Sequence, residues 1–176
     1  MNVRERRGSA RGRILEAAGR RFYADGIAST GIDAITADAG VAKMSLYNNF
    51  ASKAALVEAY VDARHEEWLG LHRARAALAA SPAGLVLAVF DAYIDHAAAA
   101  HRQGFRGCGL LNAAAELGAD DPARAAVRRH KEEVEGILAE ALGGGAQADR
   151  AADLSEHLCF LLEGAMARAG LVVIHA

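Results

Sequence analysis

The side chains best suited to nucleic-acid chemistry gather in the short segment 43–53. On a helical wheel of about 100° per residue, Leu46 and Phe50 mark an inward face. Short polar groups, a tyrosine hydroxyl and flanking lysines then point outward, and such groups contact base edges and phosphates in a DNA major groove. The outward set comprises Met44, Ser45, Tyr47 and Asn48, with Lys43 at the start and Lys53 just beyond.

A second interpretation of this pattern needs no nucleic acid. The same face is typical of a solvated helix surface, with Tyr47 covering the edge of a small core. Helical units of this kind recur in proteins with unrelated functions. The wheel and the charges alone leave both interpretations open.

Two further helices are predicted before this segment. Apolar residues from Ile14 to Phe22 recur at helical spacing and predict a first helix from Arg11 to a stop at Asp25-Gly26. Thr30 is the predicted N-cap of the second helix, with Asp33 three residues later as in a capping box.

The second helix is predicted to end at Ala39-Gly40-Val41, after which a new apolar pattern begins with Leu46. Two short helices flanking a tight glycine turn are the signature of a helix-turn-helix.

Residues 30–57 resemble the DNA-binding head of the tetracycline-repressor (TetR) family of transcriptional regulators. The resemblance extends back through the first helix, including Phe22 and Gly26. Its most specific part is the order and spacing of Ala39-Gly40-Val41, Leu46-Tyr47, Phe50, Ser52-Lys53 and Leu56.

The resemblance implies a role for each matching position. Lys43, Met44 and Ser45 occupy the start of the recognition helix, where members of the family contact bases and phosphates. Tyr47 and Asn48 follow on the same face, and Lys53 begins the next helix, where family members bind backbone phosphate. Thr30 completes the predicted DNA-binding set.

Three positions depart from the family pattern. Ala42 stands where a serine is usual, Met44 where a glycine is common, and Ala54 where a glutamate often follows the lysine. Ala42 removes one possible phosphate contact, and Met44 could meet a thymine methyl. The operator sequence therefore does not follow from the resemblance.

Composition and charge favour an all-α protein in two parts. The 176 residues include 43 Ala and only 2 Pro, a composition that favours helix. Residues 1–53 carry nine Lys/Arg against five Asp/Glu, whereas residues 54–176 carry eleven against seventeen. A basic head suits a polyanion and an acidic body repels one. We predict a DNA-binding head over residues 1–52 and a helical effector-binding and dimerisation body over residues 53–176.

The body pattern predicts a series of helices. One runs from Ser52 to about Ala80, another begins at Ser81-Pro82, and a third covers Leu110 to Leu117. A further helix begins at Asp121-Pro122 and runs to Leu142. The last covers Asp149 to about Ile174, after a Gly143-Gly144-Gly145 linker.

The resemblance implies that this last helix pairs with a second copy of the chain. Two recognition helices about one DNA turn apart read a palindrome more tightly than one does. A buried helix of a monomer is the alternative. The predicted dimerisation residues are Leu154, Leu158, Leu161, Leu162, Ala165, Met166 and Ala169.

The resemblance also implies a small-molecule pocket in the body, whose effector would draw the protein away from its operator. Each predicted lining residue could equally be an ordinary core residue. The predicted set is Trp68, His72, Phe90, Tyr93, Phe105, Cys108, Leu111, Asn112 and Phe160, with Glu116 or Glu163 as polar anchors.

Other functions find less support in the residues. No histidine pair has metal-ligand spacing, and neither a nucleophile elbow nor a dinucleotide fingerprint occurs. We expect no metal, no cofactor and no enzyme activity. Two distant cysteines and the lack of a membrane-length apolar run predict a cytoplasmic protein without a membrane partner.

Two alternatives remain open. Cys108 lies near Arg106 and between two glycines, which would suit a redox or electrophile sensor as well as a buried structural thiol. The chain could also be a helical small-molecule binding or scaffold protein that does not read DNA.

Overall fold

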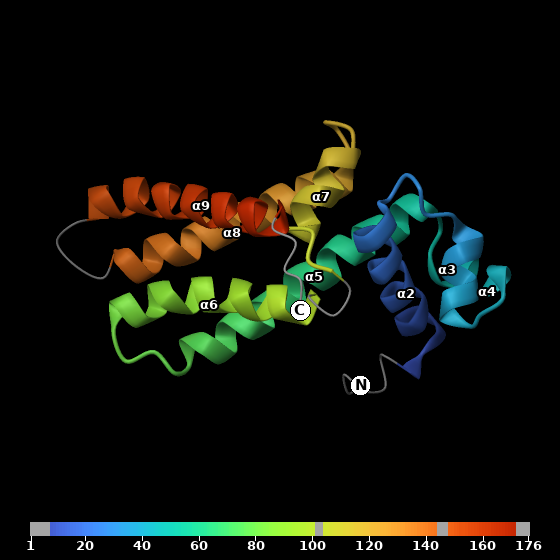
Figure 1. Cartoon of the computed structure of the whole chain (residues 1–176), viewed down its shortest axis with the longest axis horizontal. Coiled ribbons are helices and arrows are strands. Elements are labelled where there is room, and N and C mark those ends of the chain that lie inside the picture. Colours follow the sequence, from blue (N-terminus) through green and yellow to red (C-terminus); the bar gives the residue numbers. More distant parts are fainter. Residues whose placement is uncertain (1–7, 101–103, 144–147, 172–176) are drawn as a thin grey trace. The chain divides into compact units, whose positions relative to one another are not determined.

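The structure is a computed structural model that describes residues 8–100, 104–143 and 148–171. These residues form eight α-helices without a strand (Figure 1). The all-α prediction is confirmed. The predicted Gly144-Gly145 linker and the end of the last helix near Ile174 lie outside the described residues.

Three helices form the N-terminal head: α2 (Ala10–Asp25), α3 (Ile32–Ala39) and α4 (Lys43–Asn49). The hydroxyl of Ser9 caps α2 by accepting the Gly12 N–H at 3.1 Å. Gly40 ends α3 in the left-handed conformation, with φ 62° and ψ 42°. This turn, which glycine adopts without steric cost, confirms the predicted break between the two short helices.

The remaining helices are α5 (Lys53–Ala76), α6 (Pro82–Ala100), α7 (Gly109–Glu116), α8 (Pro122–Leu142) and α9 (Ala148–Leu171). Ser52 and Asp121 cap α5 and α8 through hydrogen bonds from Ala55 N–H and Ala123 N–H, as their predicted starts require. Helix α5 ends one turn before the predicted Ala80, because residues 77–79 continue as a tight turn.

Two compact units divide the chain differently from the predicted head and body. Unit 1 contains residues 1–63 and 109–127, and unit 2 contains residues 64–108 and 128–176. Helix α7 thus belongs with the head. The core of unit 2 is built by side chains from α5, α6, α8 and α9, with Trp68, Val89, Tyr93, Leu138 and Leu162 buried. None of the helices in the described part of the chain has the length and apolar character to cross a membrane.

Candidate functional site

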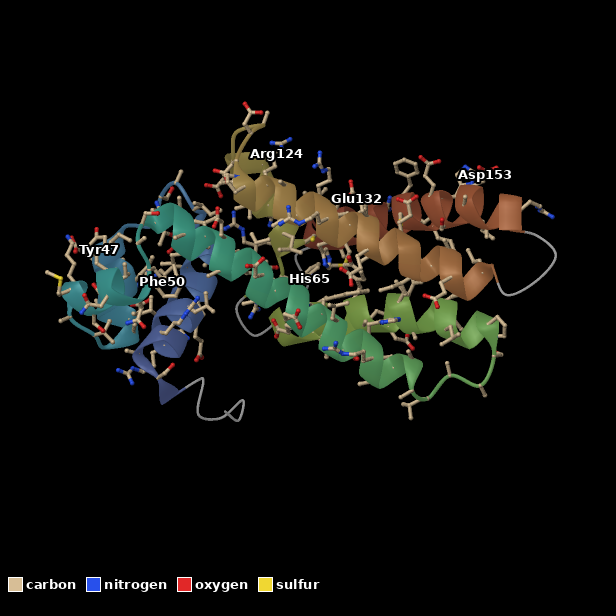
Figure 2. The ribbon with its side chains drawn as sticks, turned by 180° about the vertical axis from the view of Figure 1, so that it is seen from behind. Tyr47, Phe50, His65, Arg124, Glu132 and Asp153 are labelled. Carbon is tan, nitrogen blue, oxygen red and sulfur yellow. The ribbon has the colours of Figure 1, made fainter. Side chains whose placement is uncertain are left out.

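Helix α4 presents a polar outward face on a buried anchor. Leu46 is fully buried and Phe50 nearly so, whereas Met44 is 69% exposed and Tyr47 is 45% exposed. Asn48 is exposed and Ser45 is half-buried. Figure 2 shows Tyr47 at the outer side of α4 and Phe50 turned toward the head. The inward and outward faces are those that the wheel predicts.

The two predicted lysines differ in their surroundings. Lys53 is half-buried at the start of α5. Lys43 is exposed, and its Nζ lies 2.8 Å from Oδ1 of Asp33 on α3. The hydrogen bond from Lys43 to Asp33 raises the pKa of the lysine, so it remains fully charged.

Two arginines of α2 bind the end of α3, just before the turn to α4. Arg21 donates two hydrogen bonds to the Asp38 carboxylate, at 2.7 and 3.0 Å. These bonds raise the pKa of Arg21 and lower that of Asp38. Arg13 donates to the Ala39 carbonyl at 3.3 Å. The bidentate geometry fixes orientation as well as charge, so the end of α3 is held in a defined orientation on α2.

The structure corrects the prediction for Thr30. Helix α3 begins at Ile32 with Gly31 as its N-cap and no side-chain capping bond. The Thr30 side chain is buried, and its hydroxyl donates to the Gly26 carbonyl at 2.6 Å. Positive φ at Gly26 turns the chain after α2, and Thr30 ties that turn together. Its hydroxyl is therefore not presented to DNA.

Unit 2 contains a partly buried polar cluster beside its apolar core. Nζ of Lys131 on α8 lies 2.6 Å from Oε1 of Glu163, 3.3 Å from the Tyr93 hydroxyl and 3.7 Å from Sγ of Cys108. Burial, the largest effect, would lower the pKa of Lys131, but the three neighbours together raise it. Burial raises the pKa of Tyr93 well above its usual value. The lysine is therefore charged and the phenol neutral at physiological pH.

The cluster continues through close polar contacts from Tyr93 to two histidines and Glu133. The Tyr93 hydroxyl lies 3.3 Å from Nε2 of His130, whose Nδ1 lies 2.9 Å from Nδ1 of His65. Nε2 of His65 lies 3.5 Å from Glu133. A lysine can only donate and a carboxylate can only accept. Lys131 therefore donates to the Tyr93 hydroxyl, whereas the donor and acceptor roles of the two imidazoles depend on their tautomers.

Only part of the predicted effector set meets at this core. Trp68 and Tyr93 are buried there, Phe90, Phe105 and Cys108 pack against it, and the His72 ring stacks on Trp68. The other three do not join them: Leu111 and Asn112 lie on exposed positions of α7 in unit 1, and Phe160 is 67% exposed on α9. A surface hollow in unit 2 shares no residue with the predicted set, being lined by Leu142, Arg150, Ala151, Asp153, Leu154 and His157.

Lys131, His130 and His65 were not among the site residues predicted from the sequence. His130 and Lys131 lie on the amphipathic α8, whose charged positions predict a solvated face, and the partners of all three residues are distant in sequence. Glu163 was among the predicted polar anchors, and the structure places this residue against Lys131. Among the described residues, no group of three or more His, Cys, Asp or Glu side chains could hold a metal ion.

The predicted dimerisation residues divide between two faces of α9. Leu162 and Met166 are buried in the core of their own unit, and Leu158 packs against it, so these three side chains face inward within the chain. They occupy the core because they follow Ala151 and Ser155 at helical spacing along the inward face. The exposed remainder is Leu154, Leu161, Ala165 and Ala169.

Comparison with known proteins places this geometry in a family. Residues 14–60 match the family model described as bacterial regulatory proteins, tetR family. A TetR-family transcriptional regulator from Streptomyces coelicolor is 36% identical, with a TM-score of 0.84 over 93% of this chain and 85% of that one. Regulatory protein TetR from Rhodobacter sphaeroides is 27% identical, with a TM-score of 0.77 over 92% and 89% of the two chains.

The curated relatives match a part of the chain. HTH-type transcriptional regulator TtgR from Pseudomonas putida is 41% identical over 72 residues. That match spans 41% of this chain and about a third, 34%, of the relative. The Streptomyces coelicolor structure extends the similarity over nearly the whole chain. The chain therefore belongs to the tetR family of transcriptional regulators.

Proposed function

We propose that this chain is a ligand-responsive repressor that binds a palindromic DNA operator as a homodimer and leaves it when a small molecule binds the body. The observation that carries the proposal is the outward face of α4. It combines exposed Met44, Tyr47 and Asn48 with a charged Lys43, on a helix anchored by buried Leu46.

Each group on that face has a distinct task at a major groove. The Asn48 amide can donate to and accept from a base edge, and Met44 can pack against a thymine methyl. Lys43, Lys53 and the Tyr47 hydroxyl suit phosphate oxygens, which fix register without reading sequence. Ser45 is half-buried, and its side chain is too short to reach far beyond the helix. We therefore assign it the role of letting α4 approach the DNA closely.

An exposed apolar stripe on α9 supports the homodimer. Leu154 is 45% exposed, and Phe160 and Leu161 are each 67% exposed. Leu161 and Ala165 follow Leu154 at helical spacing, on the side away from the core. Covering such side chains with the same stripe of a second copy removes apolar area from water at about 25 cal/mol per Å². Two-fold pairing also gives the two half-sites of a palindrome.

The polar cluster of unit 2 supports an effector site in the body. A partly buried Lys131–Glu163 pair beside the core costs desolvation energy that an apolar pair would not. Convergent polar groups in an apolar setting are typical of sites that orient a small ligand. We assign Trp68, Tyr93, Phe105 and Cys108 to its walls and Lys131 to its polar contact.

Selection from random duplexes tests the proposed operator. The full-length protein should enrich a palindrome whose half-sites lie about one DNA turn apart, roughly 10 base pairs. The double variant Lys43→Ala, Tyr47→Phe should enrich it far less under the same conditions. Enrichment of no sequence by the wild-type protein would contradict DNA reading and favour a small-molecule binding or scaffold protein.

A second candidate is electrophile sensing through Cys108, favoured by the Lys131 ammonium 3.7 Å from its sulfur. A nearby cation stabilises a thiolate. The thiolate would attack the β-carbon of an α,β-unsaturated carbonyl, forming an S–C bond as the C=C π bond breaks, and Lys131 would give the enolate its proton. Burial raises the pKa of Cys159 to about 11, so that thiol serves as an internal control. Alkylation of Cys108 no faster than of Cys159 would rule this candidate out.

A further inference from the structure

The last residue of α7 is Glu116, whose carboxylate binds the loop between α2 and α3. Oε1 of Glu116 accepts the Ile27 N–H at 3.0 Å, and Oε2 accepts the Ala28 N–H at 2.8 Å. Both N–H groups belong to the loop between α2 and α3. Two charge-assisted bonds from consecutive amides hold this loop more firmly than a single neutral bond would.

The loop packs closely against the Glu116 carboxylate at this contact. Gly26 precedes it with a φ of +90°, and a Cβ there would lie 2.9 Å from Oε1 of Glu116. Ile27 is buried, and Thr30 ties the loop back to the Gly26 carbonyl. A shift of the carboxylate would therefore displace the loop that leads directly into α3.

Helix α7 is itself fixed at both ends within unit 1. At its start, a Cβ on Gly109 would lie 3.1 Å from both the Tyr23 ring and the Tyr60 hydroxyl, so α7 approaches α2 and α5 closely. At its end, Arg124 donates to the carbonyls of Ala114 and Leu117, each at 3.0 Å. The eight residues of α7 span about 12 Å between these anchors. Figure 2 shows Arg124 near the start of α8.

We propose that Glu116 is a positioning residue for operator binding, which holds the loop before α3 so that α3 and α4 meet DNA in the reading orientation. The inference rests on the proposed DNA-binding function. Glu116 lies 89 positions along the chain from Ile27 in that loop. The inference gives it a part in sequence reading that does not depend on a contact with DNA.

The sign of the effect separates positioning from simple electrostatics. A carboxylate repels phosphates, so removing its charge should by itself tighten DNA binding. Positioning predicts the opposite. Glu116→Gln removes the charge and leaves one acceptor oxygen, so one of the two amides loses its partner. Glu116→Asp keeps the charge but shortens the side chain by one methylene. Asp120→Asn is the matched control, because it removes the same charge from an exposed position beyond α7.

The experiment measures affinity of the full-length variants for the selected operator and for a random duplex, at one salt concentration and well below each unfolding midpoint. We expect Glu116→Gln and Glu116→Asp each to weaken operator binding by about tenfold, the size of one lost charge-assisted bond. Random-duplex binding should change by less than twofold. Asp120→Asn should bind both duplexes as well as, or slightly better than, the wild type.

Amide exchange gives a second readout that does not depend on DNA. The Ile27 and Ala28 amides should exchange faster in both Glu116 variants, while core amides of unit 2 keep their wild-type rates. Operator affinity unchanged or tightened in the Glu116 variants would overturn the assignment and leave the proposed function intact. A wild-type protein without sequence preference would overturn both.

Discussion

Nζ of Lys43, at the first position of the recognition helix, lies 2.8 Å from Oδ1 of Asp33 on the helix before it. The cation expected to meet a phosphate is thus already paired in the free protein. Both side chains are largely exposed, so solvent screens the pair and exchange to a phosphate costs little.

Breaking this pair from its acidic side should strengthen DNA binding. Asp33→Asn releases Lys43 and removes a carboxylate that repels phosphates, so operator affinity should rise several-fold at low salt and less at high salt. Asp62→Asn is the control, because it removes a charge from an exposed position of α5. Equal effects of the two variants in a fluorescence titration would mean that Lys43 does not act in the complex.

Lys43→Ala should weaken operator binding and flatten its salt dependence. Each lysine that neutralises a phosphate contributes about 0.9 to the slope of log K against log salt. A dimer with two such lysines should therefore lose about 1.8 from the slope. A weaker complex with an unchanged slope would contradict a phosphate contact.

Tyr47→Phe should weaken operator binding without changing stability. The phenol is exposed, so losing its hydroxyl removes a contact to DNA and none in the core. Leu46→Ala gives the complementary result, because that side chain is fully buried and its loss should cost about 2–5 kcal/mol of unfolding free energy. Thermal unfolding and operator titration of both variants separate the two roles.

The proposed dimer should dissociate when charge is introduced into the exposed apolar stripe of α9. Phe160→Glu together with Leu161→Glu places two carboxylates on exposed apolar positions without touching the core. Light scattering should then show a monomer of about 18 kDa. Leu87→Glu, at a 61% exposed position on α6, should leave the dimer intact. A dimer that survives the double change must pair through another surface.

Acid should destabilise the body through His130. Burial first, then Lys131, His65 and His96, lower the pKa of this imidazole to about 3. Because its pKa in the unfolded chain is about 6.5, the unfolded state binds more protons between these values. This stabilising contribution is complete above pH 6.5 and is lost as the pH falls toward 3. The slope from this one group approaches about 1.4 kcal/mol per pH unit.

His130→Gln should remove that slope while keeping a polar side chain at the site. Urea unfolding of both proteins from pH 7 to pH 4 compares them directly. Parallel stability curves for the two proteins would show that His130 is not the titrating group.

The local part of this fold could be predicted from sequence because its signals are local. Gly40 requires a left-handed turn, Leu46 and Phe50 fix the face of α4, and Asp121-Pro122 marks the start of α8. The N-cap prediction for Thr30 was wrong, because a threonine hydroxyl can either cap a helix or, as in this chain, close the Gly26 turn.

The long-range contacts could not be predicted in this way. Lys131 meets Tyr93 across 38 residues, and Glu116 meets Ile27 across 89. Spacing along one helix identifies a face, but it does not say which distant side chain that face meets. The polar cluster of unit 2 and the contact of Glu116 with the loop before α3 could therefore be identified only from the folded structure.

Titration of the purified protein against its selected operator at several salt concentrations tests the central claim most directly. We expect tight binding to the operator, a steep fall in affinity as salt rises, and a preference over a random duplex of at least about a thousandfold. Equal affinity for operator and random duplex at every salt concentration would contradict the proposal that α4 reads DNA sequence.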